Sequence, residues 1–140
     1  MIVLDTNVLV RVITKDDVDQ ARQAFALLQG PGPFWISRVV LLETAWTLKS
    51  RYRYTRTQVS QALHVLVALE GVEVEDRDRV RRALTLFTAG MDFGDALIAA
   101  LSPEVATVAT FDTGFVKKVK RDGGEDLPPT KLVSELVTKA

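Results

Sequence analysis

The sequence predicts an α/β fold in which helices cover both faces of a mostly parallel sheet. Short strand-like segments recur along the chain, and segments with the apolar spacing of helices separate them. Strands that are connected through helices pair in parallel, because a tight turn joins only antiparallel neighbours. With 140 residues, of which 47% are hydrophobic, we expect a single domain with a real core over residues 1–140.

The first seven residues predict the strand around which the fold is built. Residues 2–4 form a continuous apolar run, which is typical of a central strand buried on both faces. The run stops at Asp5, and Thr6 and Asn7 follow as good helix starters. We therefore expect Asp5 at the C-terminal end of a buried strand, where open parallel sheets bind ligands. Alternatively, Asp5 only caps the helix that follows.

The remaining elements alternate along the chain. Strand-like segments occupy 34–36, 72–75 and 107–111. Helical spacing of apolar residues predicts helices over 18–28 and 38–53, after Thr55, after Asp76, from Asp92 to near Pro103, after Asp112 and from Thr130. Thr55 and Gln58 form a capping-box pattern. Trp35 and Trp46 are expected in the core.

The composition restricts both chemistry and location. There are no cysteines and one histidine, His64, which excludes thiolate metal sites and an all-imidazole zinc site. Any metal is therefore held by oxygen, which favours Mg²⁺ or Mn²⁺. The 18 basic and 18 acidic residues give a formal net charge of zero, so a basic surface for nucleic acid must be local. No apolar run spans a membrane and we expect no signal peptide, which indicates a cytoplasmic protein.

Four acidic residues occupy comparable places: Asp5, Glu43, Asp95 and Asp112. Asp5 and Asp112 each follow a predicted strand, and Asp95 lies in the first turn of a helix. Glu43 lies early in the helix after the second strand, among apolar residues. Strand ends and the helix starts that follow them meet at one edge of a parallel sheet. We therefore expect the four carboxylates to lie close together there.

Each acid also has a plain structural explanation. A carboxylate in the first turn of a helix, such as Asp95, gains about 0.3–1 kcal/mol from the helix dipole. Asp112 could cap its own helix, and Asp92 could cap the helix of Asp95. Glu43 could pair with Arg38. Taken together, these explanations account less well for an acid after each apolar strand.

Clustered carboxylates call for a cation. Two unit charges about 4 Å apart repel by about 4 kcal/mol at an effective dielectric constant of about 20. Mg²⁺ takes oxygen ligands and keeps several waters, which leaves positions for a phosphate. One or two such ions can activate water and stabilise the leaving oxygen of a phosphodiester. The pattern therefore predicts metal-dependent phosphodiester hydrolysis.

Four motifs follow one another along the whole chain. They are Val-Leu-Asp-Thr-Asn-Val-Leu (3–9), Leu-Glu-Thr (42–44), Asp-Phe-Gly-Asp-Ala-Leu-Ile-Ala-Ala (92–100) and Thr-Phe-Asp-Thr-Gly-Phe (110–115). Together they resemble the PIN domain family, and most closely its VapC-type toxin ribonucleases of toxin–antitoxin pairs. The resemblance implies a three-layer α/β/α sandwich around a central, mostly parallel sheet.

The resemblance also implies an activity, ligands and partners. The activity is that of a Mg²⁺-dependent endoribonuclease, with Mn²⁺ as an alternative ion. The metal ligands and catalytic acids would be Asp5, Glu43, Asp95 and Asp112. Thr6 and Asn7 would orient the first acid or a bound water, and Asp92 matches an additional acid of variable role. The family further implies a homodimer and a cognate antitoxin that covers the active site.

Two basic segments are candidates for binding the RNA substrate. Residues 49–56 interleave four basic side chains with two tyrosines, and a second basic run over 117–121 follows Asp112. Cations hold phosphates, and aromatic faces can stack on unpaired bases. We expect RNA contacts from Lys49, Arg51, Arg53, Lys117 and Lys118. The alternative is that both runs are solvated helix ends, where cations are favourable.

Three other functions compete with a toxin ribonuclease. An aspartyl phosphatase normally has a second acid two residues after the first as general acid, and Asn7 stands there instead. A non-catalytic PIN-like binding module would not need all four acids. An RNA-processing or RNA-turnover nuclease remains an open alternative, although the absence of an extra domain favours a small stand-alone toxin.

Overall fold

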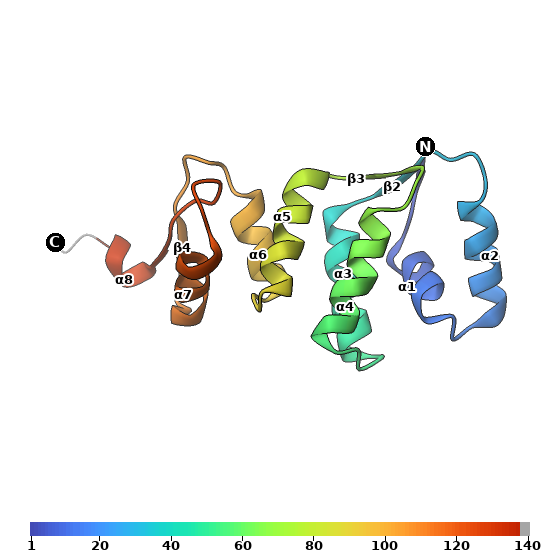
Figure 1. The fold of residues 1–140 in the computed structure, drawn as a ribbon, viewed down its shortest axis with the longest axis horizontal. Helices are drawn as coiled ribbons and strands as arrows, with labels where there is room; N and C mark the ends of the chain where they lie inside the picture. The colour runs from blue at the N-terminus through green and yellow to red at the C-terminus, as the bar shows by residue number, and fades with distance from the viewer. Residues whose placement is uncertain (138–140) are drawn as a thin grey trace. The chain divides into compact units, whose positions relative to one another are not determined.

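The computed structural model describes residues 1–137 of the chain, which divides into two compact units (Figure 1). The first unit comprises Met1–Arg81, and the second comprises Arg82–Ala140. The expectation of one domain over 1–140 stays a prediction. In the part of the chain that the structure describes, every helix is too short or too polar to cross a membrane.

A parallel three-stranded sheet organises the first unit. The elements in chain order are β1 (Ile2–Val3), α1 (Thr6–Thr14), α2 (Val18–Leu28), β2 (Phe34–Ile36), α3 (Arg38–Ser50), α4 (Arg56–Val67), β3 (Val72–Val74) and the beginning of α5 (Arg77–Thr88). The strand order is β1-β2-β3, and Phe34 pairs with Ile2 on one side and Val72 on the other. α1 packs against α2 and α3, and α3 also packs against α4 (Figure 1).

Leucine side chains from the helices are among the most deeply buried residues of this core. Leu9 of α1, Leu41 and Leu48 of α3, and Leu63 of α4 are completely buried. Burying one such side chain contributes about 1.5–3 kcal/mol relative to leaving it exposed. The contact of α1 with α3 brings Thr6, at the start of α1, near Glu43 on α3.

The second unit contains a parallel pair of strands. Its elements are the end of α5, α6 (Phe93–Leu101), β4 (Val108–Thr110), α7 (Thr113–Asp122), β5 (Thr130–Leu132) and α8 (Val133–Leu136). Val108 of β4 pairs with Thr130 of β5, and α7 packs against both strands. The buried rings of Phe87 and Phe93 meet at 5.5 Å between centroids and fix α6 to the end of α5.

The structure confirms the α/β class and the parallel pairing of strands. It differs from the expected single sheet, because the strands form a sheet of three and a sheet of two. β1 stands at the end of the order β1-β2-β3, and Ile2 and Val3 are 42% and 65% exposed. The prediction of a strand buried on both faces is therefore wrong for these two residues. An apolar run this short does not specify how many faces are covered, and Leu4 alone is buried.

Trp46 is the clearest error among the predicted core residues, because it is 64% exposed. The buried stripe of α3 runs through Leu41, Ala45 and Leu48. Trp46 lies off this stripe, since side chains one or two positions apart do not share a helix face. The large apolar side chain of Trp46 suggested burial, but Trp46 faces solvent because its position on the helix lies off the buried stripe. Trp35 of β2 is half-buried.

The helix expected from Thr130 is also wrong at its start, because residues 130–132 form β5. The short helix α8 follows it, and Leu136 on that helix is 44% exposed. Pro128 and Pro129 favour an extended chain just before β5. Pairing with β4 then extends this conformation to Leu132, which is a tertiary effect that local propensity does not contain.

The capping box at the start of α4 is confirmed. Thr55 Oγ1 accepts a hydrogen bond from the N–H of Gln58 at 3.2 Å, and Gln58 Oε1 accepts one from the N–H of Thr55 at 2.9 Å. Two backbone donors at the helix start are satisfied in this way.

Replacing the cap should therefore destabilise the protein measurably. We expect Thr55→Ala to lower the free energy of unfolding by about 1 kcal/mol in urea denaturation, because a backbone donor loses its partner. Thr57→Ala is the matched control, since Thr57 is exposed within the helix, and its effect should stay within about 0.5 kcal/mol. Equal losses for both variants would contradict the capping argument.

Candidate metal-binding site

Asp5 is positioned by the start of α1. Leu4 is 1% exposed and anchors the chain between β1 and the helix. Asp5 itself is the N-cap, with extended backbone angles of φ −81° and ψ 161°, and its side chain is exposed. Its Oδ1 accepts a hydrogen bond from the N–H of Thr6 at 2.8 Å. The helix start therefore fixes the direction of this carboxylate.

Glu43 reaches the same end of α1 from α3. Thr6 is 7% exposed, and its hydroxyl donates a hydrogen bond to Glu43 Oε2 at 3.4 Å. Thr6 therefore contacts both acids, Asp5 through its N–H and Glu43 through its hydroxyl. Within the first unit, two acids that are far apart in the sequence belong to one local arrangement.

Arg38 does not neutralise Glu43. Its guanidinium lies 3.5 Å from Glu75 and 3.0 Å from Asp76 instead. The alternative that Glu43 pairs with Arg38 is therefore wrong. Among the described residues, Glu43 accepts a weak hydrogen bond from Thr6 and forms no salt bridge.

In the second unit, Asp92, Asp95 and Asp112 form what we call the acidic cluster. Asp92 is the N-cap of α6, and its Oδ2 accepts from the N–H of Asp95 at 3.1 Å. Asp112 is the N-cap of α7, and its Oδ1 accepts from the N–H groups of Gly114 at 2.8 Å and Phe115 at 3.2 Å. The starts of α6 and α7 therefore hold the members of the cluster.

The electrostatics of the acidic cluster centre on Asp95, which is half-buried. Burial raises the pKa of the Asp95 carboxyl above its ordinary value, and the negative charges of Asp92 and Asp112 raise this pKa further. The ammonium of Lys118 acts in the opposite direction and lowers the pKa, but it does not outweigh the other causes. The cluster therefore carries more negative charge than its surroundings balance.

Helix capping leaves acceptor positions available on the candidate carboxylates. A carboxylate offers two oxygens with about four acceptor positions. The capping bonds engage only Oδ1 of Asp5, Oδ2 of Asp92 and Oδ1 of Asp112. The capping explanations for these three residues are confirmed, and each residue keeps a second oxygen for a ligand.

The donor set suits a hard divalent cation. All candidate donors are carboxylate oxygens, which Mg²⁺ and Mn²⁺ prefer. His64 is engaged on α4, where its Nδ1 lies 2.7 Å from the carbonyl oxygen of Ser60. Among residues 1–137, no three or more His, Cys, Asp or Glu side chains are arranged so that they could hold an ion. The chemistry of the donors fits such a cation, while a coordination geometry is not formed by the described residues.

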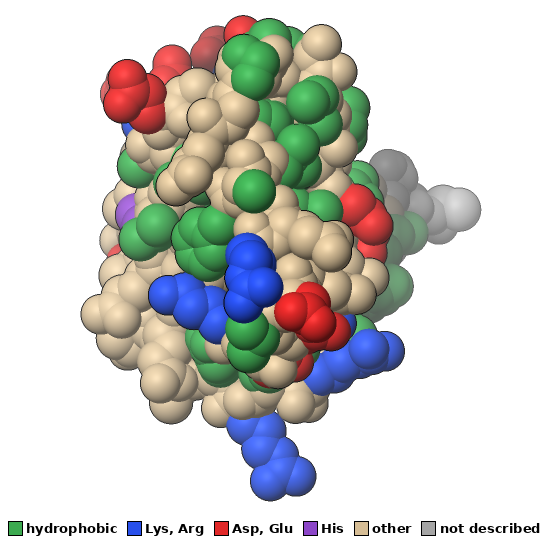
Figure 2. Space-filling model, turned by 90° about the vertical axis from the view of Figure 1, so that its right-hand side faces the viewer, with side chains coloured by type: hydrophobic (Ala, Val, Ile, Leu, Met, Phe, Trp, Pro, Cys, Tyr) green, Lys and Arg blue, Asp and Glu red, His purple; other side chains and the backbone are tan. Residues whose placement is uncertain are grey.

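The basic residues predicted to contact RNA differ in their exposure. Lys118 is half-buried beside the acidic cluster. The other four are exposed, namely Lys49, Arg51, Arg53 and Lys117. The hydroxyl of Tyr52 donates to Asp16 at 2.7 Å and accepts from Arg11 at 3.0 Å, which fixes the position of this ring, and base stacking on it stays a prediction. On the face shown in Figure 2, cationic side chains lie in separate groups among hydrophobic and acidic ones. A basic surface, where present, is local, as the net charge of zero requires.

The model of the PIN domain family matches residues 2–121, a range that includes every candidate acid in both units. The chain belongs to the PIN domain family. Among curated proteins, none matches the chain. PIN domains are generally metal-dependent nucleases, so membership supports nuclease activity in general.

Lys118 has an electrostatic role that the sequence analysis did not assign to it, and its contact with RNA stays a prediction. Lys118 was expected among the RNA contacts, and the structure puts its charge close enough to Asp95 to influence it. The signal was present, because Lys118 follows Gly114 by four positions and so shares a helix face with the capped first turn of α7. Asn7, expected to assist Asp5, is exposed and borders a cavity between α1 and α2.

The raised pKa of Asp95 predicts how pH affects the metal-free protein. The folded state disfavours ionised Asp95, so the penalty is present at neutral pH and disappears as the pH falls to the ordinary value of 3.8. We expect Asp95→Asn to raise the free energy of unfolding at pH 7 in the presence of chelator. This gain should shrink as the pH falls from 7 to 4, as followed by urea denaturation.

Asp19→Asn is the matched control. Asp19 is an exposed acid on α2 that lies 3.8 Å from Arg22, and removing its charge should not stabilise the protein at either pH. A stabilisation by Asp95→Asn that is the same at pH 4 and pH 7 would show that charge is not its cause.

Proposed function

We propose that this PIN domain is a Mg²⁺- or Mn²⁺-dependent endoribonuclease, and that its metal ligands are Asp5 and Glu43 in the first unit and Asp95 and Asp112 in the second. The observation that carries this proposal is the acidic cluster, in which burial, and after it the charges of Asp92 and Asp112, raise the pKa of the Asp95 carboxyl. A divalent cation would supply the missing positive charge. Membership of a family of nucleases makes a phosphodiester the natural substrate.

The side chains of this chain have distinct roles in the proposed reaction. A bound divalent cation would polarise the phosphodiester and lower the pKa of a water molecule. Thr6 orients Asp5 through its N–H and Glu43 through its hydroxyl. Asp92 holds the first turn of α6 and so positions Asp95. Asn7 directly follows Thr6 in the sequence, and we propose that it orients a bound water.

We further propose that the enzyme is the cytoplasmic toxin of a toxin–antitoxin pair and forms a homodimer. Support comes from α3, where Val39, Leu42 and Trp46 are 62%, 40% and 64% exposed. Their spacing of three and four residues places them on one helix face. Glu43 directly follows Leu42, so a partner that covers this apolar face would also restrict access to Glu43. An antitoxin that blocks the active site would need such a surface.

RNA cleavage tests the proposed reaction directly. We expect the purified protein to cleave RNA with Mg²⁺ or Mn²⁺ and to stop when chelator is added. Asp95→Asn should reduce the rate at least on the order of a thousandfold, because it removes the charge that attracts the cation while keeping the shape of the side chain. Asp19→Asn should cleave at the wild-type rate. Cleavage that Asp95→Asn leaves unchanged would exclude the proposed site.

Expression in growing bacteria separates a toxin from the alternative RNA-processing or RNA-turnover nuclease. A toxin should arrest growth, and Asp95→Asn should abolish this arrest. Cleavage in vitro without growth arrest would instead favour the processing or turnover role. Metal titration that detects no binding would favour a non-catalytic binding module.

The contribution of the segment 49–53 to RNA binding can be measured through salt dependence. For single-stranded RNA, the logarithm of the binding constant falls with the logarithm of salt concentration by about 0.7 per neutralised phosphate. We expect the combined replacement of Lys49, Arg51 and Arg53 by Ala to reduce this slope by about 2. Arg22→Ala removes an exposed cation on α2 and should leave the slope unchanged. An unchanged slope in the triple variant would show that these are solvated helix-end charges.

A further inference from the structure

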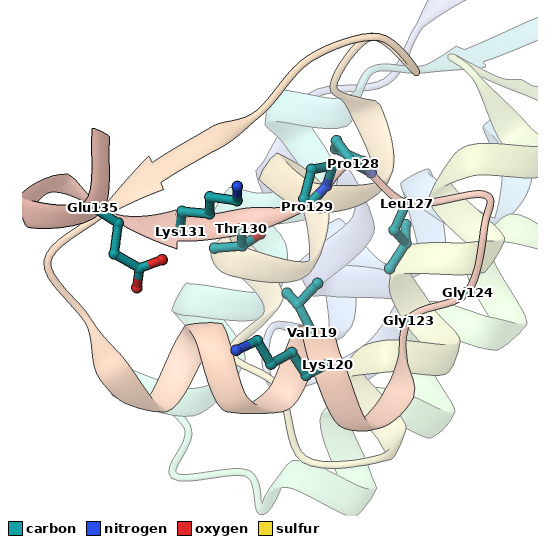
Figure 3. Close-up of a pocket in the computed structure, with 10 residues that line it drawn as sticks. All are labelled: Val119, Lys120, Gly123, Gly124, Leu127, Pro128, Pro129, Thr130, Lys131 and Glu135. Carbon is teal, nitrogen blue, oxygen red and sulfur yellow. The ribbon is translucent and has the colours of Figure 1, made fainter. Parts of the chain in front are cut away.

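The second unit contains a pocket that none of the proposed metal ligands lines. It lies between the end of α7, the loop after it and β5, and its volume is about 360 Å³ (Figure 3). Asp112 stands at the beginning of α7, whereas Val119 and Lys120 near its end line the pocket. α7 has 10 residues, so its two ends are separated by about 15 Å. The pocket is therefore distinct from the acidic cluster.

Thr130 gives this pocket an unusual polar group. The residue lines the pocket and is 4% exposed, and its Oγ1 is buried without a hydrogen-bond partner among the described residues. A buried hydroxyl without a partner destabilises the folded state, because it has lost its hydrogen bonds to water and has formed none within the protein. Native structures rarely keep such a group without a reason. Because this oxygen is closed to solvent, a ligand can bond to it only where the lining of the pocket shifts, and Thr130 would then gain its missing partner.

The lining indicates which ligand would fit. Lys120 and Lys131 contribute two positive charges and Glu135 one negative charge, so the lining favours an anion. In Figure 3, Lys120 and Glu135 extend into the space between α7 and β5. Leu127 and Pro129 add apolar surface at the other end of the pocket. The pocket therefore combines a cation for a phosphate, a hydroxyl and a carboxylate for polar groups, and an apolar wall for a flat ring.

We propose that this pocket binds a nucleoside monophosphate unit, either as a free nucleotide or as one nucleotide of an RNA strand. Lys120 holds the phosphate, Glu135 accepts hydrogen bonds from ribose hydroxyl or base amino groups, and the base lies against Leu127 and Pro129. The Thr130 hydroxyl hydrogen-bonds to the ligand. The volume of the pocket falls in the range of small-molecule sites, which is about 300–1,000 Å³.

Thr130→Val tests this assignment, because valine keeps the shape and removes the hydroxyl. Binding of CMP and AMP to the full chain is measured by calorimetry in the presence of chelator, and a four-nucleotide RNA is measured under the same conditions. We expect Thr130→Val and Lys120→Ala each to weaken binding of at least one of these probes about tenfold. Inorganic phosphate alone and cytidine alone should bind more weakly than CMP, since each fills half of the site.

Two controls separate binding from folding and from catalysis. Thr130→Val should raise the melting temperature of the free protein by a few degrees, because it removes the unsatisfied hydroxyl, so that lost binding cannot be attributed to unfolding. Thr107→Val changes an exposed threonine just before β4 and should affect neither quantity. Thr107→Val should also retain metal-dependent RNA cleavage.

The outcomes show which kind of ligand the pocket binds and whether the proposal is correct. Weakened CMP or AMP binding identifies a site for free nucleotides, and a weakened tetranucleotide alone identifies a subsite for the RNA strand. Wild-type affinities of Thr130→Val for all three probes, or no saturable binding of any probe to the wild type, would overturn the inference. Nucleotide binding without RNA cleavage would contradict the proposed nuclease and leave this inference standing.

Discussion

Repulsion between carboxylates is the constraint that the candidate site must accommodate. Asp95 is held between two other acids at the starts of two helices, and a single ammonium, that of Lys118, acts against their combined charge. Helix N-termini relieve part of this repulsion, because their unpaired N–H groups favour negative charge. They do not remove it, since the pKa of Asp95 remains raised by burial and by its acidic neighbours. The metal-free protein therefore carries an electrostatic cost at the place where a cation would be useful.

The capping residues show that a structural and a functional explanation can hold for the same side chain. Asp5, Asp92 and Asp112 are helix caps in the structure, as the simplest interpretation of the sequence expected. A cap needs one carboxylate oxygen, aims it at the helix axis, and leaves the other oxygen free. Capping thereby fixes the orientation of Asp5 and Asp112, which we propose as metal ligands, without an additional residue. The two explanations were alternatives only as long as each carboxylate was treated as a single acceptor.

The sequence predicted what depends on local patterns and missed what depends on tertiary context. Apolar periodicity located α1 to α7, and the capping box at Thr55 was correct in detail, because both are properties of neighbouring residues. The exposure of Trp46 and Val3 and the strand at Thr130 were missed, since each depends on which distant segment packs or pairs there. For the site, sequence position indicated the acids and the link of Thr6 to Asp5. The hydrogen bond of Thr6 to Glu43 and the effect of Lys118 on Asp95 follow only from the packing of α1 on α3 and from the neighbourhood of Asp95.

Two residues of the second unit share a physical property that sets them apart from its packed core. Asp95 is a partly buried charge whose surroundings do not balance it, and Thr130 is a buried hydroxyl without a partner. Both lower the stability of the free protein, and both would be relieved by a bound species, a cation in one case and a hydrogen-bonding ligand in the other. A chain selected only for stability would replace them by Asn and Val, which have nearly the same shapes. Their presence therefore argues that the second unit is built to bind, and that its stability should rise when its ligands are present.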